Sequence, residues 1–385
     1  MESIRVWHLS SNPWNSAITE YAINSVQALK GRGYKNVFSP LIDSPAHFRA
    51  QKLGIKVIPF HSFSIKALKQ FYCLSKKINP DVIICYEGLE AFLCKLVPGM
   101  KKKVCLIRFR GRCLKKREKR YSFFLKLANS HMDQVISPGL ALNSEIKKNM
   151  TNPPTELVTL GIDTKRYCFN QKRQFTLAEQ PRLVVLGRLD PVKGHREFLP
   201  IFAEVLKNWP DNQEVKKPIL HFVGKPESLD TKSIHQSASL CGLEKNKDYI
   251  LTPHRVQNTP TLLTNSCIGV IPSLWSEEIC RVAEEFLSCG TPVFVSGVGA
   301  LKDVLFPGAG WCYENLSSIK TAQLLEKATI EAAAETNEKR MARSETAKKL
   351  FSIERKGCDL DRLIRNILEN KQSVYKLTKD LSQPV

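Results

Sequence analysis

Two cations lie in a short glycine-bearing segment that follows an apolar run. The run covers residues 183–186, and Arg188 and Lys193 come directly after it, together with Gly187. A short apolar run that ends in turn residues is typical of a buried parallel strand. Because residues 195–207 read as a helix, the two cations would lie beside a helix amino terminus, where backbone N–H groups attract anions. This combination predicts a binding site for a diphosphate.

Two carboxylates follow a second apolar run later in the chain. Residues 268–273 read as a strand and residues 279–288 as a helix, with Glu277 in the loop between them and Glu285 inside the helix. A carboxylate offers about four lone-pair sites, so it can hold two sugar or ribose hydroxyls at once. The alternatives are that Glu285 is a solvated acid paired with Arg281, and that Glu277 is a first-turn acid favoured by the helix dipole.

These residues need a scaffold of alternating strands and helices. The expected strands are residues 5–9, 37–38, 57–58, 81–85, 104–109, 134–137, 157–160, 183–186, 219–223, 249–251, 268–271 and 293–295. Helical patterns separate them, and this βαβ alternation predicts an α/β fold with parallel sheets covered by helices. The alternation stops over the polar stretch 165–180. We therefore expect two α/β domains, residues 1–168 and 181–350, and a helical tail over residues 351–385.

Composition excludes several classes of protein. The chain has 385 residues, of which 43% are hydrophobic and 25% charged, as is ordinary for a soluble globular protein. No apolar run reaches the roughly 18 residues of a membrane span, and no secretory hydrophobic region is seen, so we expect a cytoplasmic protein. The twelve cysteines show neither Cys-x-x-Cys nor zinc-ligand spacing and are expected to be reduced.

Basic residues give the chain a formal net charge of +21. They are densest over residues 101–120, where eleven positions are Lys or Arg and one is an acid. Such a field attracts an anionic partner, which could be nucleic acid, an anionic membrane leaflet or a phosphorylated substrate. The alternative is a solvated, lysine-rich surface.

Four motifs together resemble the retaining family-4 (group 1) glycosyltransferases of GT-B fold. They are Gly161-Ile162-Asp163, Gly187-Arg188-Leu189-x-x-x-Lys193-Gly194, Pro272-Ser273-x-x-x-Glu277 and Glu285-x-x-x-Cys289-Gly290-Thr291-Pro292-Val293. Each motif is weak alone, but their order and spacing make a specific signal. The resemblance implies two facing Rossmann-like domains, the first for the acceptor and the second for a nucleotide-sugar donor. It also implies that the C-terminal helix returns to the first domain.

The resemblance assigns roles to particular residues. Arg188 and Lys193 would hold the donor diphosphate, Glu277 the transferred sugar and Glu285 the nucleotide ribose, with Arg188, Lys193 and Glu277 catalytic. Fixed cations stabilise the charge that grows on the leaving diphosphate, at about 3 kcal/mol for one donor group, so neither a metal nor another cofactor is expected. The sequence Asp359-Leu360-Asp361 matches a metal-binding Asp-x-Asp but falls in a predicted helix. The expected donor-binding residues are Gly187, Arg188, Lys193, Glu277, Ile279, Cys280 and Glu285.

Three departures from the family pattern affect both substrates. Residues 10–16 replace a Gly-Gly turn after the first strand, and Ile279-Cys280 replaces the usual Phe-Gly. Arg110 stands where many relatives carry a His before the acceptor loop, which favours an anionic acceptor. The candidate residues for contact with the acceptor or a membrane are Asn12, Trp14, Arg108, Arg110 and Arg112.

These features predict a retaining glycosyltransferase that moves a sugar to an anionic envelope glycolipid or polysaccharide, of lipopolysaccharide type. Residues 101–120 would dock the first domain on an anionic leaflet, at the inner face of the cytoplasmic membrane. The alternative is a non-catalytic protein of the same fold that binds an anionic polymer or nucleic acid. The complete set of site residues favours the enzyme, so nucleic acid is not the expected partner. A phosphorylase or an epimerase ranks lowest.

Overall fold

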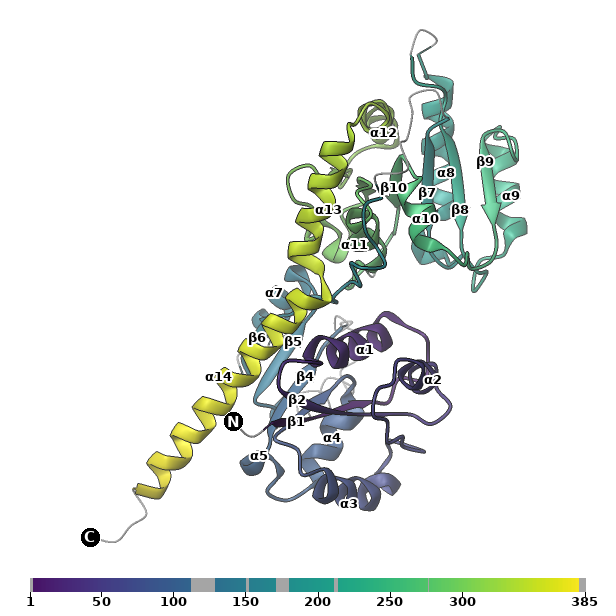
Figure 1. The fold of residues 1–385 in the computed structure, drawn as a ribbon. Coiled ribbons are helices and arrows are strands. Elements are labelled where there is room, and N and C mark those ends of the chain that lie inside the picture. Colours follow the sequence, from purple (N-terminus) through teal and green to yellow (C-terminus); the bar gives the residue numbers. More distant parts are fainter. Residues whose placement is uncertain are drawn as a thin grey trace. The chain divides into compact units, whose positions relative to one another are not determined.

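The computed structural model describes residues 3–111, 129–149, 152–170, 180–210, 214–275 and 277–380. The chain divides into two compact units, which Figure 1 colours along the sequence. Unit 1 combines Met1–Gly161 with Ile353–Val385, and unit 2 is Ile162–Ser352. Each unit is built on a six-stranded parallel sheet with helices packed on it, which confirms the predicted α/β class.

Unit 1 contains a sheet of strand order β2-β1-β3-β4-β5-β6. Its strands are β1 (Ile4–Ser10), β2 (Tyr34–Pro40), β3 (Val82–Cys85), β4 (Cys105–Phe109), β5 (Gln134–Ser137) and β6 (Thr155–Leu157). Its helices are α1 (Ala17–Leu29), α2 (Pro45–Lys52), the 3-10 helix η1 (Ile65–Ala67), α3 (Leu68–Ile78), α4 (Gly88–Leu96), α5 (Met100–Lys103), α7 (Leu140–Asn149) and α14 (Ile353–Asp380). Because β2 and β3 lie on opposite sides of β1, the strand order reverses between β1 and β3.

Helices cover both faces of this sheet, which is why all of β3 and most of β4 are apolar. On one face Trp7 of β1 stacks on Phe71 of α3, with ring centroids 5.0 Å apart. On the other face Tyr21 of α1 stacks on Phe109 of β4 at 3.8 Å. The segment around Val57, predicted as a strand, instead forms isolated bridges to Phe38 of β2 and to Leu41 directly after β2. Pro40 of β2 has no N–H to donate to the Ile58 carbonyl, and this interrupts the ladder between the Ile58 and Phe60 hydrogen bonds.

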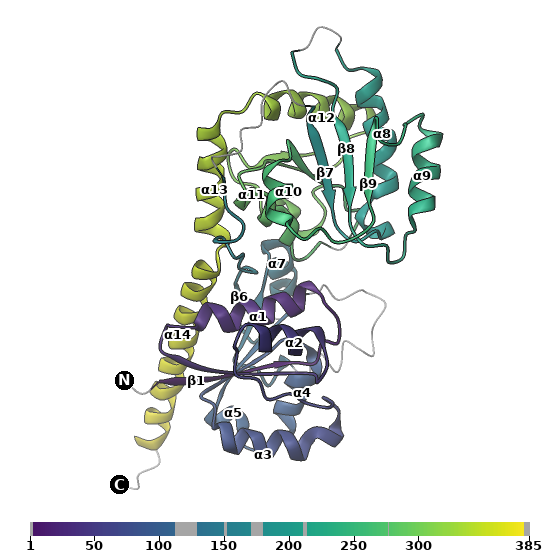
Figure 2. The same ribbon diagram turned by 45° about the vertical axis from the view of Figure 1, so that its right-hand side comes forward.

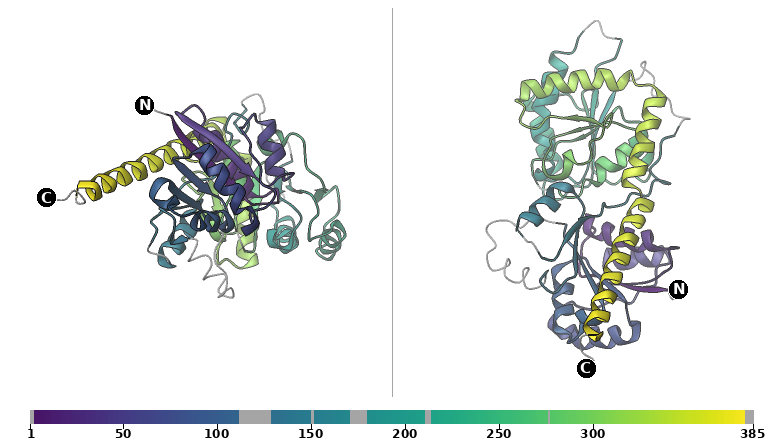
Figure 3. Two further views of the ribbon diagram at one scale, coloured as in Figure 1. Left: turned by 90° about the horizontal axis from the view of Figure 1, so that it is seen from below. Right: turned by 90° about the vertical axis from the view of Figure 1, so that its left-hand side faces the viewer.

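Helix α14 lies along unit 1 as one long helix (Figure 3). The ammonium of Lys356 is fully buried against α1 and donates hydrogen bonds to the carbonyls of Tyr21 and Leu160, at 3.1 and 3.0 Å. Farther along α14, Lys371 donates to the carbonyls of Lys101 and Val104. The C-terminal helix thus packs on the unit formed by the N-terminal residues.

Unit 2 contains a sheet of strand order β12-β11-β10-β7-β8-β9. Its strands are β7 (Arg182–Leu186), β8 (Ile219–Val223), β9 (Tyr249–Thr252), β10 (Ile268–Ile271), β11 (Val293–Val295) and β12 (Gly310–Cys312). Its helices are α8 (His195–Lys207), α9 (Thr231–Leu240), α10 (Thr259–Thr264), α11 (Arg281–Ser288), α12 (Ser318–Ala333), α13 (Asn337–Phe351) and the 3-10 helices η2 (Pro191–Lys193) and η3 (Gly299–Lys302). Figure 2 shows β7, β8 and β9 side by side with α8 and α9.

The two faces of this sheet are also covered. Helices α8, α9 and α12 share one apolar cluster with the sheet, to which Ile268 and Val270 of β10 contribute. Gly269 between them points to the opposite face, where its missing side chain leaves room for the ring of Phe286 on α11. The connection between the units differs from expectation. Residues 162–168, predicted in the first domain, belong to unit 2, where Tyr167 is buried.

The length and hydropathy of the helices bear on whether any of them could span a membrane. No helix in the part of the chain that the structure describes is both long enough and apolar enough to cross a bilayer.

Candidate donor and acceptor sites

The strand order of unit 2 reverses between β7 and β10. After β7 the chain moves outward through β8 and β9, and it then returns to place β10 on the other side of β7. In open α/β sheets a ligand crevice forms at this point, outside the carboxyl ends of the strands. Arg188 and Lys193 lie in the loop after β7, and Glu277 lies in the loop after β10. The topology thus brings the predicted cations and one predicted acid to the same edge.

Three loops are joined closely at this edge. Gly194 has φ +68°, and a Cβ there would lie 2.0 Å from the carbonyl oxygen of Pro272. The N–H of Leu274 donates to the carbonyl of Val192 at 2.9 Å, so the loops after β7 and β10 share a backbone hydrogen bond. From the loop after β11, the N–H of Ala300 donates to the carbonyl of Glu277 at 2.7 Å. These contacts fix the backbone around Glu277.

Lys193 and Glu277 form an ion pair at this edge of the sheet. The Lys193 ammonium donates to Oε1 of Glu277, which is nearly buried. The hydroxyl of Ser273 donates to the same oxygen at 2.6 Å. Ser273 is itself held, because its carbonyl accepts from the hydroxyl of Ser296 at 2.7 Å. The arrangement presents one cation and one oriented carboxylate side by side.

Arg188 lies on the same loop but contacts other acids. Its guanidinium donates from Nη1 to Oε2 of Glu227, and Nη2 lies 3.7 Å from Oδ2 of Asp190. Asp190 also accepts from the N–H of Val192 at 3.0 Å, which caps η2. The Arg188 side chain is 54% exposed. The Glu227 side chain is 51% exposed as well, and exposed ion pairs of this kind contribute about 0–1 kcal/mol, so a phosphate can replace Glu227 at little cost.

Glu285 occupies a buried position on α11. Its Oε1 accepts from Nε of Arg281 at 2.7 Å, and the carboxylate is 3% exposed. Burial and then the charge of Glu285 raise the pKa of Tyr167 to about 12. The alternative interpretation of the sequence was a solvated acid paired with Arg281. Its partner is correct, but Glu285 is buried and not solvated. Helix α13 packs against α11, where Ser344 donates a hydrogen bond to the carbonyl of Ser288.

The Ile279-Cys280 departure is accommodated without backbone strain. Cys280 has φ −85°, so this position does not need the positive φ that a glycine permits. Its side chain is buried, and burial, followed by the charge of Glu277, raises the pKa of the thiol. Helix α11 begins at Arg281, two residues later than predicted. At Gly187, by contrast, a Cβ would meet open space.

Sequence reasoning missed several residues that hold the predicted ones. Ser273 was part of a quoted motif, but only the fold shows that its hydroxyl binds Glu277. The Arg188–Glu227 pair joins residues 39 apart, and no local pattern indicates it. Tyr167 belongs to the same group as Arg281 and Glu285, although it precedes them by more than 100 residues.

In unit 1 the strand order reverses between β1 and β3, and polar residues gather there. Asn12, which is 2% exposed, donates from Nδ2 to Oε1 of Glu87 at 3.0 Å and accepts from the N–H of Trp14 at 2.9 Å. Trp14 is 70% exposed. The N–H of Ser11 donates to Oε1 of Glu90, the next acid after Glu87. Two acids from the start of α4 therefore hold the loop that replaces the family's Gly-Gly turn.

Glu90 is the most buried of these acids. No part of its side chain is exposed, and in the described residues Oε2 has no hydrogen-bond partner. Burial, followed by the charge of Glu87, raises the pKa of Glu90 to about 8. Neither acid was predicted as a site residue. Their position directly after the apolar strand 81–85 was the available signal.

The predicted basic residues of unit 1 lie in different environments. Arg108 is 4% exposed inside β4 and donates to Asn129. Burial, followed by the charge of Arg110, lowers the pKa of Arg108 to about 10. Arg110 follows the strand and is also buried. Arg112 and the rest of the basic segment after residue 111 lie outside the described residues.

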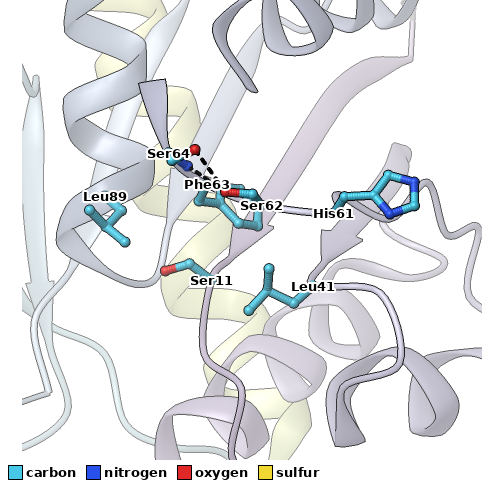
Figure 4. Close-up of a pocket in the computed structure, with 7 residues that line it drawn as sticks. All are labelled: Ser11, Leu41, His61, Ser62, Phe63, Ser64 and Leu89. Atoms are coloured by element: carbon cyan, nitrogen blue, oxygen red, sulfur yellow. Dashed lines mark hydrogen bonds between the residues drawn. The ribbon is translucent and has the colours of Figure 1, made fainter. Parts of the chain in front are cut away.

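A pocket of about 310 Å³ opens at this edge of the unit 1 sheet. Figure 4 shows Ser11 and Leu41 facing the hydrogen-bonded pair Ser62 and Ser64, with Leu89 to one side. The remaining lining residues are His61 and Phe63. As for metals, no cluster of three His, Cys, Asp or Glu that could hold an ion occurs among the residues the structure describes. Asp359 and Asp361 of the Asp-x-Asp sequence pair with arginines on α14.

Comparison with known proteins identifies the larger part of unit 2. Residues 169–350 match the family model "Glycosyl transferases group 1". The resemblance to group 1 glycosyltransferases is thereby confirmed for this part of the chain. The match contains all of the predicted donor-binding residues.

Curated relatives match shorter stretches. The D-inositol 3-phosphate glycosyltransferase of Arthrobacter sp. (strain FB24) is 30% identical over 129 residues, 33% of this chain and 28% of that protein. The spore coat protein SA of Bacillus subtilis (strain 168) is 25% identical over 165 residues, 40% of this chain and 43% of that protein. The chain thus spans less than half the length of each.

Solved structures match almost the whole chain. Anabaena HepE in complex with UDP has a TM-score of 0.77 at 16% identity, covering 94% of this chain and 100% of that one. The lipopolysaccharide outer core galactosyltransferase WaaB has a TM-score of 0.69 at 13% identity, covering 94% and 99%. At these identities the likeness concerns the fold alone, and it confirms the predicted GT-B fold.

Proposed function

We propose that the protein is a retaining glycosyltransferase that uses a nucleoside-diphosphate sugar as donor. The observation that carries this proposal is the contact between Lys193 and Glu277 at the strand-order reversal of unit 2. It places a cation suited to a diphosphate beside a carboxylate suited to sugar hydroxyls. The family match and the complexes of Anabaena HepE with UDP and with UDP-glucose support it.

The chemistry follows from these side chains. When the donor binds, Lys193 and Arg188 exchange their carboxylate partners for diphosphate oxygens, and Glu277 accepts hydroxyls of the sugar. The bond from the anomeric carbon to the diphosphate then breaks, a bond to the acceptor oxygen forms on the same face of the sugar, and the proton of the acceptor hydroxyl passes to the departing diphosphate oxygen. Cations already in place stabilise the charge on the leaving diphosphate. Glu285, held by Arg281, would accept the ribose hydroxyls.

Hydrolysis of UDP-glucose, measured as UDP released, tests this function. Arg188→Ala and Lys193→Ala should each lower kcat by about 100-fold or more, as loss of one charge-stabilising donor does. Lys232→Ala, an exposed lysine on α9, is the matched control and should keep wild-type turnover. Wild-type turnover in both site variants would reject the proposal. Polyanion binding without a saturable nucleotide-sugar site would instead favour the non-catalytic alternative.

The proposal includes independence from metals and other cofactors. The fixed cations Arg188 and Lys193 supply the positive charge that a divalent ion supplies elsewhere. Turnover should therefore be unchanged by EDTA and should not rise on addition of Mg²⁺ or Mn²⁺. A loss of activity with EDTA that Mn²⁺ restores would contradict this part.

For the acceptor, we propose an envelope glycolipid or polysaccharide with anionic groups. The buried arginines at the end of β4 and the net charge of +21 support an anionic acceptor, and WaaB, a lipopolysaccharide galactosyltransferase, supports the class. We further propose a location at the inner face of the cytoplasmic membrane through contact with anionic lipid. Nucleic acid is not the proposed partner.

A further inference from the structure

The pocket in unit 1 lies at the carboxyl ends of strands β1, β2 and β3. Ser11 follows β1, Leu41 follows β2, and Leu89 lies in the first turn of α4 after β3. The fourth wall is the segment 61–64, which precedes η1. A volume of about 310 Å³ is at the small end of the range of roughly 300–1,000 Å³ for ligand pockets. It suits a single small ring.

The lining combines hydroxyl groups with apolar walls. Ser62 donates to Ser64 at 2.9 Å, which leaves the proton of the Ser64 hydroxyl available for another acceptor. Ser11 adds a third hydroxyl from the facing side (Figure 4). Leu41 and Leu89 are apolar. A sugar ring presents the matching surface, because its hydroxyls lie around the edge and its C–H groups on the faces.

Charge narrows the class of ligand further. Apart from the titratable His61, no side chain that the structure describes in the lining carries a charge. A phosphate or carboxylate placed inside would lose hydration without gaining a counter-charge. The arginines at the end of β4 are not part of the lining. The lining therefore favours an uncharged ring.

The wall formed by the β1 loop is held in place before any ligand arrives. The N–H of Ser11 is bound by Glu90, and the side chain of Asn12 is bound by Glu87. Asn12 also accepts from the N–H of Trp14, which completes a turn. A wall that is already ordered does not lose further conformational freedom on binding, and this favours affinity.

From these observations we infer that the pocket lined by Ser11, Ser62, Ser64, Leu41 and Leu89 binds an uncharged sugar ring of the acceptor. The assignment to the acceptor rests on the proposed function. Binding of the ring itself does not, so the two can be tested separately. Any anionic group of the acceptor then lies outside this pocket.

Saturation-transfer NMR with the methyl glycosides of glucose, galactose, mannose and N-acetylglucosamine tests the inference. At least one glycoside should bind the wild-type protein. The Leu89→Trp substitution, which fills the pocket, should lower the affinity for that glycoside by about tenfold or more, which corresponds to about 1.4 kcal/mol. Leu140→Trp on α7 is the matched control, since these leucines are 52% and 56% exposed. Ser62→Ala together with Ser64→Ala removes the hydroxyls without adding bulk and should also weaken binding.

Three outcomes would overturn the inference. They are no binding of any glycoside, equal binding by wild type and the Leu89→Trp variant, and glucose 6-phosphate binding at this pocket about tenfold more tightly than the methyl glucoside. UDP-glucose in a thermal-shift assay separates the two proposals. Glycoside binding without a shift by UDP-glucose or by any other nucleoside-diphosphate sugar of a panel would reject the proposed function and keep the pocket. A UDP-glucose shift without glycoside binding would reject the pocket alone.

Discussion

Glu90 is an acid whose burial should make the stability of the protein depend on pH. Its raised pKa, about 8 against the ordinary 4.5, means that the folded state keeps a proton that the unfolded state releases. The stability it contributes is therefore fully present below about pH 4.5 and is lost as the pH rises toward 8. The β1 loop and Glu87 act directly on this titration, and Glu90 also interacts electrostatically with Arg108 and with the thiol of Cys85.

Glu90→Gln should remove this dependence, since the amide stays neutral at every pH. We expect the free energy of unfolding of the variant, relative to wild type, to rise by up to about 1.4 kcal/mol per pH unit between pH 5 and pH 8. Urea denaturation at several pH values measures it. Glu354→Gln, at an exposed acid of α14, is the control. Parallel curves for wild type and Glu90→Gln would contradict the prediction.

At the scale of residues, local motifs predicted which side chains lie at the site but not what holds them. Lys193 and Glu277 were predicted because each follows an apolar run at a motif spacing. Their mutual contact depends on β7 and β10 being neighbours, which a sequence pattern does not encode. The burial of Glu285 was missed for the same reason. The covering helix, α13, comes about 50 residues later in the chain.

At the scale of elements, the site depends on how tightly loops after neighbouring strands pack. Most strand and helix positions could be predicted, because most buried strands are short apolar runs between turn residues. Strand β12, whose three residues are only partly buried, was missed, and β6 lies at Thr155–Leu157 and not at the predicted residues 157–160. The contacts between the loops after β7 and β10 could not be predicted from the sequence. Gly194 was noted as part of a motif, yet its role follows from the carbonyl of Pro272, which occupies the space of a Cβ.

Gly194→Ala should therefore separate the loops after β7 and β10. Its left-handed backbone alone costs an alanine about 1–2 kcal/mol, and the overlap with Pro272 adds to this. Gly242→Ala is the matched control, because Gly242 has φ +71° and open space around its Cβ. Urea denaturation should show a larger loss of stability for Gly194→Ala, and thermal shift a weaker response to UDP. Equal losses in both variants and an unchanged UDP response would argue against the packing account.

At the scale of the whole molecule, charge is the property that acts at a distance. A net charge of +21 produces a field that a salt solution screens over about 8–10 Å. The proposed membrane location depends on this field, since juxtamembrane Lys and Arg each contribute about 1 kcal/mol near an anionic leaflet.

Sedimentation with lipid vesicles measures this contact. The protein should bind vesicles that contain phosphatidylserine, fail to bind pure phosphatidylcholine, and be released as sodium chloride approaches 0.5 M, because the attraction is electrostatic. Binding that does not depend on anionic lipid would contradict the proposed location while leaving the proposed chemistry intact.

The division of unit 1 has a consequence for how the protein is made. Its N-terminal part and α14 are separated by about 190 residues of unit 2. At roughly 5–20 residues per second, the ribosome needs about 10–40 s to add those residues before α14 appears. During that interval the carbonyls of Tyr21 and Leu160 have no Lys356 to bind them, and the α1 surface is open to chaperones. The first unit begun in synthesis is thus the last to be completed.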